Sequence, residues 1–508
     1  MTVADVKPPE GLAPAARTRA VVRGSVWLIV TGVLSRALGV VGTLVLTHLV
    51  APDAYGEVSD ASVVAFTMNV IASVGVGIYV IANPNAPPRD RFHATVIHLV
   101  LGALFIIPLP LFGGPLGRLF GAPTMGRYLP GMVVAVMLTR VSLLPERMMV
   151  SRMRFGVISM ERAGGELLYT LVSVLGAAAG MGAMAVVAGN VARAGLRLVV
   201  LVALVSWRDW LQPCRLRLET FARIVRFGWP VSLGQTIGFA LRRWDNLIVS
   251  WMYGAAVVGA YNLAYNLADI PAIQIGEQIT EALQVSFAGE QNSDSIHRLL
   301  RSVSVLAFIM TPMAVGLGAI APTLADLFLD KRWSGAGPML VWLSVISFPR
   351  PLSGAVASYM QVRNGRRAFL TLEAFTLATL LGSLLTIGRW GPLAACVAVG
   401  ATFILRLAFA AVLLWRLNGV PMGAFFRPQL PPLLASLIMA AAVVATRLGL
   451  QASRAPLLLS LSAQLTVGVA FYAIAARLLA PATWQDAIAL IRRTAARGRG
   501  KSATPALG

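Results

Sequence analysis

Arginine side chains recur inside long apolar stretches of this 508-residue chain. An arginine at the centre of a bilayer costs about 2.5–3.5 kcal/mol even on a lenient insertion scale, so each one must face a cavity, an acidic partner or an interface. The planar guanidinium stays protonated and binds phosphate groups through paired N–H donors. Such arginines around an intramembrane cavity would hold an anionic cargo and would suit a cationic drug badly. They are Arg36, Arg140, Arg193, Arg197, Arg242, Arg243, Arg350 and Arg406.

Arg36 is the strongest cavity candidate, because its apolar stretch contains no acidic residue. Arg193 and Arg197 share one helical face with Asn190, since residues three and four positions apart lie on the same side of a helix. If the chain consists of two related halves, Arg36 and the pair at 242–243 would converge across a central cleft.

Ion pairing and interfacial placement are the alternatives for these arginines. Arg242 lies one helical turn before Asp245 and could be neutralised by it. Arg140 could extend to the lipid headgroups. Arg350 stands between two prolines, which should bend its helix and free backbone groups that need a protein or water lining. A charged bend of this kind suits a moving part or a ligand contact.

The stretch 256–284 contains a stripe of polar residues, Asn262, Asn266 and Asp269, which recur at helical spacing. These side chains predict either a cavity wall or hydrogen bonds that hold neighbouring helices together. Asp269 and Asp245 are the candidates for binding a coupling ion.

No soluble-type active site is apparent in the sequence. Walker, nucleophile-elbow and dinucleotide motifs are missing, and the four histidines and two cysteines lack metal-ligand spacing. We therefore expect a transporter with no cofactor and no metal ion.

The elements that carry these residues are membrane helices. The chain is 57% hydrophobic and 13% charged, with a mean hydropathy of +0.75, so water cannot be its main solvent. The apolar runs are long enough to cross a bilayer. They predict an all-α polytopic protein with about 14 transmembrane helices, at 24–49, 57–82, 93–112, 128–148, 162–181, 183–206, 229–251, 256–284, 300–321, 337–360, 368–388, 392–415, 432–450 and 457–480.

The net charge of +22 comes mostly from arginines in the loops between these runs. Most of the 43 Lys and Arg residues fall in alternate loops, on the side that also holds both termini. The positive-inside rule makes that side cytoplasmic. Anionic lipid headgroups then account for the charge, and no nucleic-acid partner is expected.

The helices divide into two predicted lobes. An N-terminal tail at 1–23 precedes an N-lobe at 24–206, and a basic cytoplasmic linker at 207–228 leads to a C-lobe at 229–416. Two further helices at 432–480 and a basic tail at 481–508 complete the chain. The segment 56–61 echoes 259–264, each opening the second helix of its half, as a duplicated six-helix lobe would produce. Short Gly and Ala matches also arise by chance.

Several motifs resemble the Wzx-like oligosaccharide flippases, the polysaccharide transporters of the multidrug/oligosaccharidyl-lipid/polysaccharide exporter superfamily. They are SRALG at 35–39, APDAYG at 51–56, MRF at 153–155 and GAYNLAYNLA at 259–268, followed by Pro271. The resemblance spans most of the first twelve helices. The last two helices match only as hydrophobic spans.

The resemblance implies fourteen helices, two pseudo-symmetric six-helix lobes and a basic central cavity. Its cargo would be an undecaprenyl-diphosphate-linked repeat unit, moved by alternating access to the periplasmic leaflet of the bacterial inner membrane for surface or exopolysaccharide synthesis. Arg36 carries over best as a cavity residue, followed by Arg242 and Arg243. Membrane lipids and a polysaccharide polymerase are the further partners implied.

Three other functions remain open at this point. A cation-coupled multidrug exporter of the same superfamily would depend on a membrane-embedded acid. A membrane polymerase or ligase would need a large periplasmic loop, and the predicted outside loops are short. A lipid II type flippase would be separated by the lethality of its deletion.

Overall fold

The computed structural model of the protein describes residues 38–83, 86–152, 154–277, 279–280, 292–481 and 484–485. Every regular element among these residues is a helix, so the all-α prediction is confirmed for this part of the chain. The helices fall into two compact units. Unit 1 comprises the residues up to Leu263 with Leu329–Ala336 and Leu377–Ala398, and unit 2 comprises Ala264–Phe328, Gly337–Thr376 and the residues from Val399 onward.

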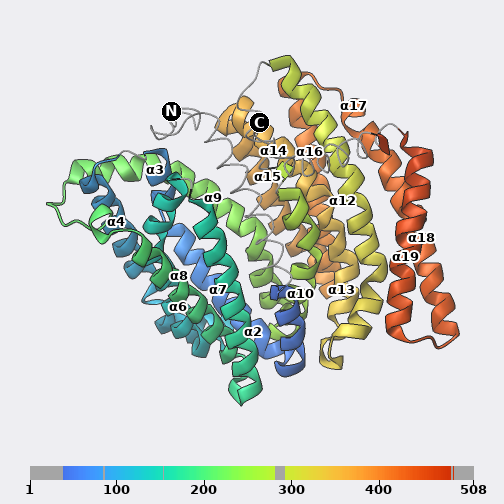
Figure 1. Cartoon of the computed structure of the whole chain (residues 1–508), viewed down its shortest axis with the longest axis horizontal. Coiled ribbons are helices and arrows are strands. Elements are labelled where there is room, and N and C mark those ends of the chain that lie inside the picture. Colours follow the sequence, from blue (N-terminus) through green and yellow to red (C-terminus); the bar gives the residue numbers. More distant parts are fainter. Residues whose placement is uncertain are drawn as a thin grey trace, which may run out of the picture. The chain divides into compact units, whose positions relative to one another are not determined.

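Unit 1 contains most of the first half of the chain (Figure 1). Its helices are α2 (Pro52–Ile71), α3 (Val76–Ala82), α4 (Pro88–Ile106), α5 (Gly113–Leu119), α6 (Met125–Ser151), α7 (Phe155–Gly176), α8 (Met184–Leu204), α9 (Leu218–Tyr253) and the first part of α10 (Ala255–Ala268). Short helical turns are η2 (Leu109–Phe112), η3 (Ala177–Met181), η4 (Trp207–Asp209), η6 (Lys331–Trp333) and η8 (Ile387–Trp390).

Unit 2 contains the later helices. They are α12 (Asn292–Phe328), α13 (Ala336–Leu343), α14 (Pro349–Arg363), α15 (Gly365–Thr386), α16 (Pro392–Asn418), α17 (Met422–Phe426), α18 (Leu430–Ala452) and α19 (Leu457–Leu479), with α13, α15 and α16 each partly in unit 1. Its short turns are η5 (Ala272–Glu277), η7 (Ser344–Ser347) and η9 (Arg427–Gln429).

The described residues account for fewer apolar spans than the fourteen predicted for the whole chain, so that number stays a prediction. Among the described residues, ten helices are long and apolar enough to cross a membrane, or eleven if α2 and α3 form one bent span. The predicted stretch 24–49 is described only from residue 38, as the short apolar helix Leu38–Leu49. The predicted spans at 229–251 and 256–284 correspond to α9 and α10. Charged residues interrupt the apolar character of α9, and α10 is only 14 residues long.

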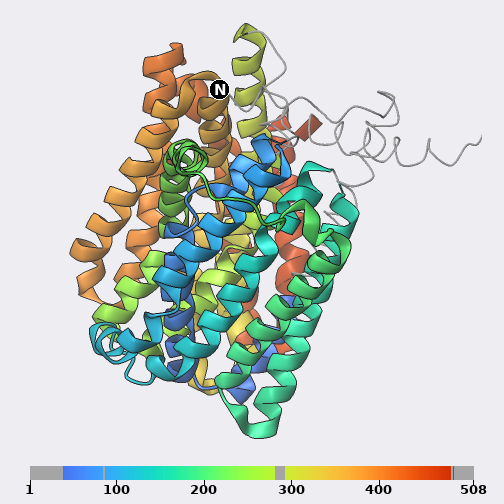
Figure 2. The ribbon, with the colours of Figure 1, turned by 90° about the vertical axis from the view of Figure 1, so that its left-hand side faces the viewer.

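The core of unit 1 lies between α2, α6 and α8, with α7 lying alongside α8 (Figure 1 and Figure 2). Val64 of α2, Met132 and Val136 of α6 and Val187 of α8 are buried in one apolar cluster. Because lipid tails are as apolar as these side chains, close van der Waals packing is what holds such helices together in a membrane.

The predicted helix at 57–82 is broken, which corrects the expectation of one continuous span. α2 and α3 meet at an angle of 50°, and Gly75 at the break has a left-handed φ of 64°. A Cβ on Gly75 would lie 2.4 Å from the carbonyl oxygen of Gly228, and one on Gly228 would lie 1.9 Å from that of Val74. The bend therefore depends on a backbone-to-backbone contact with α9 that only glycines allow.

A second glycine contact joins α2 to α10. A Cβ on Gly56 would lie 1.9 Å from the oxygen of Ala255, and one on Gly259 would lie 2.0 Å from that of Pro52. Each glycine therefore contacts the carbonyl group of the residue that lies one helical turn before the other glycine. The contact is reciprocal, as a local two-fold relation between these echoing segments requires, although the two six-helix lobes as wholes stay a prediction.

Two antiparallel helices close the described chain. α18 and α19 match the predicted stretches 432–450 and 457–480 and pack against α12 in unit 2 (Figure 1). Gln464 of α19 exchanges hydrogen bonds with Thr323 of α12, with the amide nitrogen donating over 2.9 Å. Interhelical hydrogen bonds of this kind stabilise the packing of helices whose remaining contact surface is apolar.

The predicted linker at 207–228 contains more helix than expected. Its first part holds the short turn η4, but α9 begins already at Leu218 and continues without interruption through Pro230 to Tyr253. The high density of arginine suggested a loop. Arg208, Arg215 and Arg217 do precede the helix, but Arg223 and Arg226 lie on its exposed side, and arginine is a good helix former.

Candidate functional site

A cavity of about 300 Å³ lies within unit 1. Helices α2, α7, α8, α9 and α10 supply its walls. Its lining residues are Tyr55, Val58, Ser59, Ser62, Val63, Phe66, Tyr169, Val186, Asn190, Arg193, Phe239, Arg243 and Asn262. Two arginines and no acidic residue occur among these described lining residues, so the cavity has a basic lining.

Arg193 of α8 is held in place at the cavity wall. Its guanidinium donates to the amide oxygen of Asn190 over 2.7 Å and forms an ion pair with Glu166 at 3.3 Å. The guanidinium carbon also lies 5.0 Å from the ring centroid of Tyr169. The side chain remains 39% exposed, so the ion pair with Glu166 leaves guanidinium surface available to a ligand.

Asn262 belongs to a hydrogen-bond chain between helices. Its amide nitrogen donates to the hydroxyl of Ser59 and to the amide oxygen of Asn246, each over 2.9 Å. Ser59 and Asn262 are both cavity residues, so this chain fixes the wall where α2, α9 and α10 meet. Asn262 thus has both of the roles that the sequence left open, as a wall residue and as an interhelical hydrogen-bond donor.

Aromatic rings complete the lining. Tyr55, Phe66, Tyr169 and Phe239 present flat apolar surfaces beside the two arginines. Aromatic faces accept the apolar faces of ring-shaped ligands, and arginines bind phosphate oxygens. The cavity can therefore accommodate a ligand that combines an anionic group with a ring.

The predicted site residues separate into distinct environments. Arg193, Arg243 and Asn262 meet at the cavity. Arg242 is exposed on α9 and is not among the lining residues, because consecutive helical positions point about 100° apart. Arg36 lies outside the described residues.

Two other predicted cavity arginines are instead ion-paired with acids. Arg197 pairs with Glu146, a buried acid that Arg162 also approaches at 3.3 Å. Arg350 of unit 2 forms a 2.5 Å ion pair with Asp269, and both side chains are nearly buried. For these two positions, the structure shows the ion pairing that the sequence left open as the alternative.

The remaining predicted polar residues lie apart from the cavity lining. Asn266 is half-buried in the unit 2 part of α10. Asp245 is buried in unit 1 and accepts a 2.5 Å hydrogen bond from the hydroxyl of Tyr261. Asp269 is the ion-pair partner of Arg350. The role of Asp245 and Asp269 in ion coupling stays a prediction.

Arg140 has a structural role that differs from the predicted contact with lipid headgroups. It is 1% exposed and donates to the carbonyl oxygens of Asn69 and Ala72, each over 3.0 Å, and to that of His98. Asn69 and Ala72 lie at the end of α2, where the break before α3 leaves carbonyl groups without helical partners. Arg140 therefore stabilises the bend.

Sequence reasoning missed some of the residues that line the cavity. The rings of Tyr55, Tyr169 and Phe239 and the hydroxyls of Ser59 and Ser62 line the cavity, yet they look like ordinary membrane-helix residues in the sequence. One sequence signal did point to the contact between these segments. Ser59 and Asn262 are separated by 203 residues, the same separation as between the echoing glycines Gly56 and Gly259.

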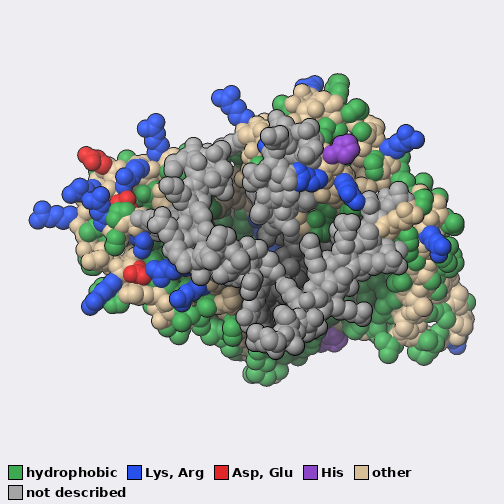
Figure 3. Space-filling model, turned by 45° about the horizontal axis from the view of Figure 1, so that its top comes forward, with side chains coloured by type: hydrophobic (Ala, Val, Ile, Leu, Met, Phe, Trp, Pro, Cys, Tyr) green, Lys and Arg blue, Asp and Glu red, His purple; other side chains and the backbone are tan. Residues whose placement is uncertain are grey.

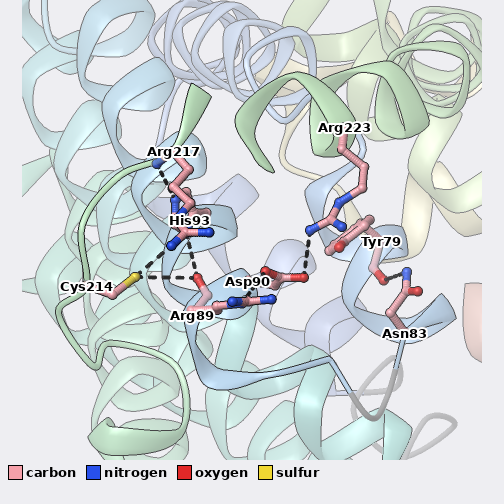
Figure 4. Close-up of polar contacts among 8 residues, drawn as sticks. All are labelled: Tyr79, Asn83, Arg89, Asp90, His93, Cys214, Arg217 and Arg223. Atoms are coloured by element: carbon pink, nitrogen blue, oxygen red, sulfur yellow. Dashed lines mark hydrogen bonds and ion pairs between the residues drawn. The ribbon is translucent and has the colours of Figure 1, made fainter. Parts of the chain in front are cut away.

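A second polar cluster surrounds the start of α4 (Figure 4). Arg223 of α9 pairs with Asp90 at 2.9 Å. The Nε2 atom of His93 accepts the backbone N–H of Arg217 over 2.8 Å, while its Nδ1 atom donates to the oxygen of Arg89 over 2.7 Å. These contacts fix the segment before α9 to α4. A cavity of about 480 Å³ nearby is lined by a single turn of α9 and lacks the convergence of several helices.

Metal binding finds no support among the described residues, where no group of three His, Cys, Asp or Glu side chains could hold an ion.

Comparisons with known proteins identify the family. Residues 45–338, more than half of the chain, match the family described as "Polysaccharide biosynthesis protein". The chain belongs to this family. Its relatives include the Escherichia coli lipopolysaccharide biosynthesis protein WzxC, 20% identical over 67% of this chain and 70% of that protein. The succinoglycan biosynthesis transport protein ExoT of Rhizobium meliloti is 23% identical over 66% of this chain and 67% of that protein.

Solved structures share the fold of this family member. The lipid II flippase MurJ in an inward closed conformation has a TM-score of 0.72 at 12% identity, covering 89% of this chain and 98% of MurJ. The Vibrio cholerae MATE transporter VcmN has a TM-score of 0.56 at 14% identity, covering 80% and 98%. With its family and its apolar helices, the protein is a multi-pass transmembrane transport protein of polysaccharide biosynthesis.

Proposed function

We propose that the protein is a flippase that moves undecaprenyl-diphosphate-linked oligosaccharide repeat units from the cytoplasmic to the periplasmic leaflet of the bacterial inner membrane. Alternating access of two lobes, 24–206 and 229–416, would carry the cargo across. The observation that carries the proposal is the intramembrane cavity that combines Arg193 and Arg243 with aromatic rings and no lining acid.

The charge of the cavity favours an anionic cargo. A diphosphate that leaves water needs donors that stay protonated, and a guanidinium supplies two parallel N–H groups to each phosphate. An exporter of cationic drugs would need a carboxylate that faces its substrate. The described lining contains no carboxylate. The polarity of the cavity thus supports a phosphate-bearing ligand over a cationic drug.

The size of the cavity indicates which part of the cargo it holds. A volume of about 300 Å³ is at the lower end for small-molecule sites, which span about 300–1,000 Å³. It accommodates the diphosphate and the first sugar, whose ring would stack on Tyr169 or Phe239. The polyprenyl chain would stay in the bilayer, and the sugars beyond the first would need a wider, cargo-bound form.

The proposed orientation places both termini in the cytoplasm. On the face viewed in Figure 3, Lys and Arg side chains gather and acidic ones are few among the described residues, which supports this face as the cytoplasmic one. With a cytoplasm-negative potential, moving about two negative charges outward gains about 4–5 kcal/mol per 100 mV. The membrane potential would therefore assist export, and a polysaccharide polymerase would receive the product.

The neighbouring arginines of α9 provide a matched test. Arg243→Ala should lower polysaccharide export about tenfold or more, since a hydrogen bond to a charged group contributes about 1.5–3 kcal/mol. Arg242→Ala should leave export near the wild-type level, because Arg242 is exposed beside the cavity rather than in its lining. Surface polymer and membrane-protein level are measured in a strain in which each variant replaces the native gene.

Two results would reject the proposal. Normal export by the variants Arg193→Ala and Arg243→Ala, at normal protein levels, would remove the arginines from the transport path. The protein would instead be assigned to drug export if it exported cationic dyes and if its loss left the amount of surface polymer unchanged.

A further inference from the structure

A buried acid of α2 lies just behind the cavity wall and has no role in the proposed cargo site. Asp60 is 0% exposed, and it follows Ser59, which lines the cavity. Its Oδ1 atom has no hydrogen-bond partner among the described residues. An ionised carboxylate in such a place, without a cation to balance it, would be strongly destabilising.

The single hydrogen of the Ser250 hydroxyl has two possible acceptors beside Asp60. The Ser250 hydroxyl of α9 contacts Asp60 Oδ2 and also lies 2.9 Å from the carbonyl oxygen of Phe120. A serine hydroxyl has one hydrogen to donate, and a carbonyl oxygen can only accept. If Ser250 donates to Phe120, the hydrogen between Ser250 and Asp60 must come from the carboxyl group.

Glu57, one helical turn earlier, shows the opposite arrangement. Its Oε1 atom accepts the backbone N–H of Thr124 over 3.1 Å, and its Oε2 atom contacts the Thr124 hydroxyl. Both contacts supply hydrogens to Glu57, as an ionised carboxylate requires. Both carboxylate oxygens of Glu57 thus have a donor, whereas Asp60 Oδ1 has none among the described residues.

From this contrast we infer that Asp60 is a proton-binding site behind the cavity, neutral in this conformation, that links α2 to Ser250 of α9. The bound species is a proton on Oδ2. Its release leaves a carboxylate and a free proton, and the carboxylate then needs water or a cation. Ionisation therefore requires α2 and α9 to part beside Ser59, so the proton and the shape of the cavity are linked.

The groups that face Asp60 are few. Glu57 of the same helix is the titratable neighbour that acts on it, and a nearby negative charge favours the neutral acid. From α9 and from the segment after α5, the facing groups are the Ser250 hydroxyl and the Phe120 carbonyl. Asp245 of α9 is engaged by Tyr261.

Substitution by the matching amide separates the two acids. Asp60→Asn keeps a donor toward Ser250, so the melting temperature of the purified protein should stay close to that of wild type. Glu57→Gln replaces an acceptor oxygen with an NH₂ group that faces a donor of Thr124, so it should lower the melting temperature. Equal destabilisation by the two variants, or a larger loss for Asp60→Asn, would overturn the assignment.

Infrared spectroscopy tests the proton directly and does not depend on transport. Wild-type protein in nanodiscs at neutral pH should show the carbonyl band of a buried protonated carboxyl group, shifted in D₂O. That band should be missing from folded Asp60→Asn and retained in Glu57→Gln. A band unchanged in Asp60→Asn, or one abolished by added sodium at constant pH, would contradict a proton site.

The transport consequence rests on the proposed function. Asp60→Asn should bind cargo but fail to complete export, because it cannot ionise. If the infrared result holds and the variant exports normally, the proton site stands as a property of the fold and its link to transport is rejected. If neither wild type nor variant exports polymer, the flippase proposal fails while the infrared result still decides the proton site.

Discussion

The predicted arginines of unit 2 and those that line the unit 1 cavity have different surroundings. In unit 2, Arg406 and Arg350 are each paired with a nearly buried acid, at 2.5 Å from Glu373 and Asp269 respectively. In unit 1, Arg193 and Arg243 line a cavity whose described lining contains no acid. A buried charge pair neutralises an arginine within the packed helices, as Glu146 does for Arg197 in unit 1, whereas Arg193 remains 39% exposed at the cavity despite its ion pair with Glu166.

Unit 1 itself contains a third solution, at Arg140. This arginine is 1% exposed, and its guanidinium donates to the carbonyl oxygens of Asn69 and Ala72, where α2 breaks, and to that of His98. Its charge supports the backbone of a bend. Burial and partners, not the presence of arginine alone, therefore distinguish a structural from a ligand-binding position.

The largest effect on stability is expected at the unit 2 ion pair. Glu373→Ala should destabilise the protein by about 3–5 kcal/mol, because it leaves Arg406 buried without its acid. Replacing both partners with apolar residues, as in Glu373→Leu with Arg406→Met, should restore much of this loss. Thermal unfolding in detergent measures both variants. A double variant no more stable than Glu373→Ala would show that the pair does more than neutralise charge.

A smaller loss is expected at the bend. Arg140→Met should cost about 1–3 kcal/mol, the usual penalty for leaving a buried polar group unsatisfied, because the Ala72 carbonyl loses this donor while the Asn69 carbonyl keeps that of the Ser73 hydroxyl. Amide hydrogen exchange should rise at the end of α2 and at the start of α3. Unchanged exchange and unchanged thermal stability would mean that another group satisfies the Ala72 carbonyl.

Much of the helical architecture could be predicted from the sequence, because apolar length is a strong signal in a membrane protein. The stretches 183–206, 432–450 and 457–480 correspond closely to α8, α18 and α19. The break within 57–82 escaped prediction because it depends on contact between Gly75 and the distant Gly228.

The candidate site was only partly predictable. Arginine inside an apolar run drew attention to Arg193 and Arg243, since a buried charge always needs an explanation, and the structure places both in the lining of one cavity. Which arginines find an acid depends on helix packing: Glu146 lies 51 residues from Arg197, and Asp269 lies 81 residues from Arg350. Aromatic wall residues carried no signal at all.

The central claim is that the unit 1 arginines bind a diphosphate headgroup, and binding by the purified protein tests it most directly. Wild-type protein in nanodiscs, with Arg243→Ala and the adjacent Arg242→Ala as a matched pair, is titrated with a polyprenyl-diphosphate-linked sugar and with the corresponding uncharged polyprenol. We predict that wild type and Arg242→Ala bind the diphosphate, that Arg243→Ala binds it about tenfold or more weakly at unchanged stability, and that the polyprenol binds weakly to all three. Equal affinity of wild type and Arg243→Ala for the diphosphate would contradict the claim.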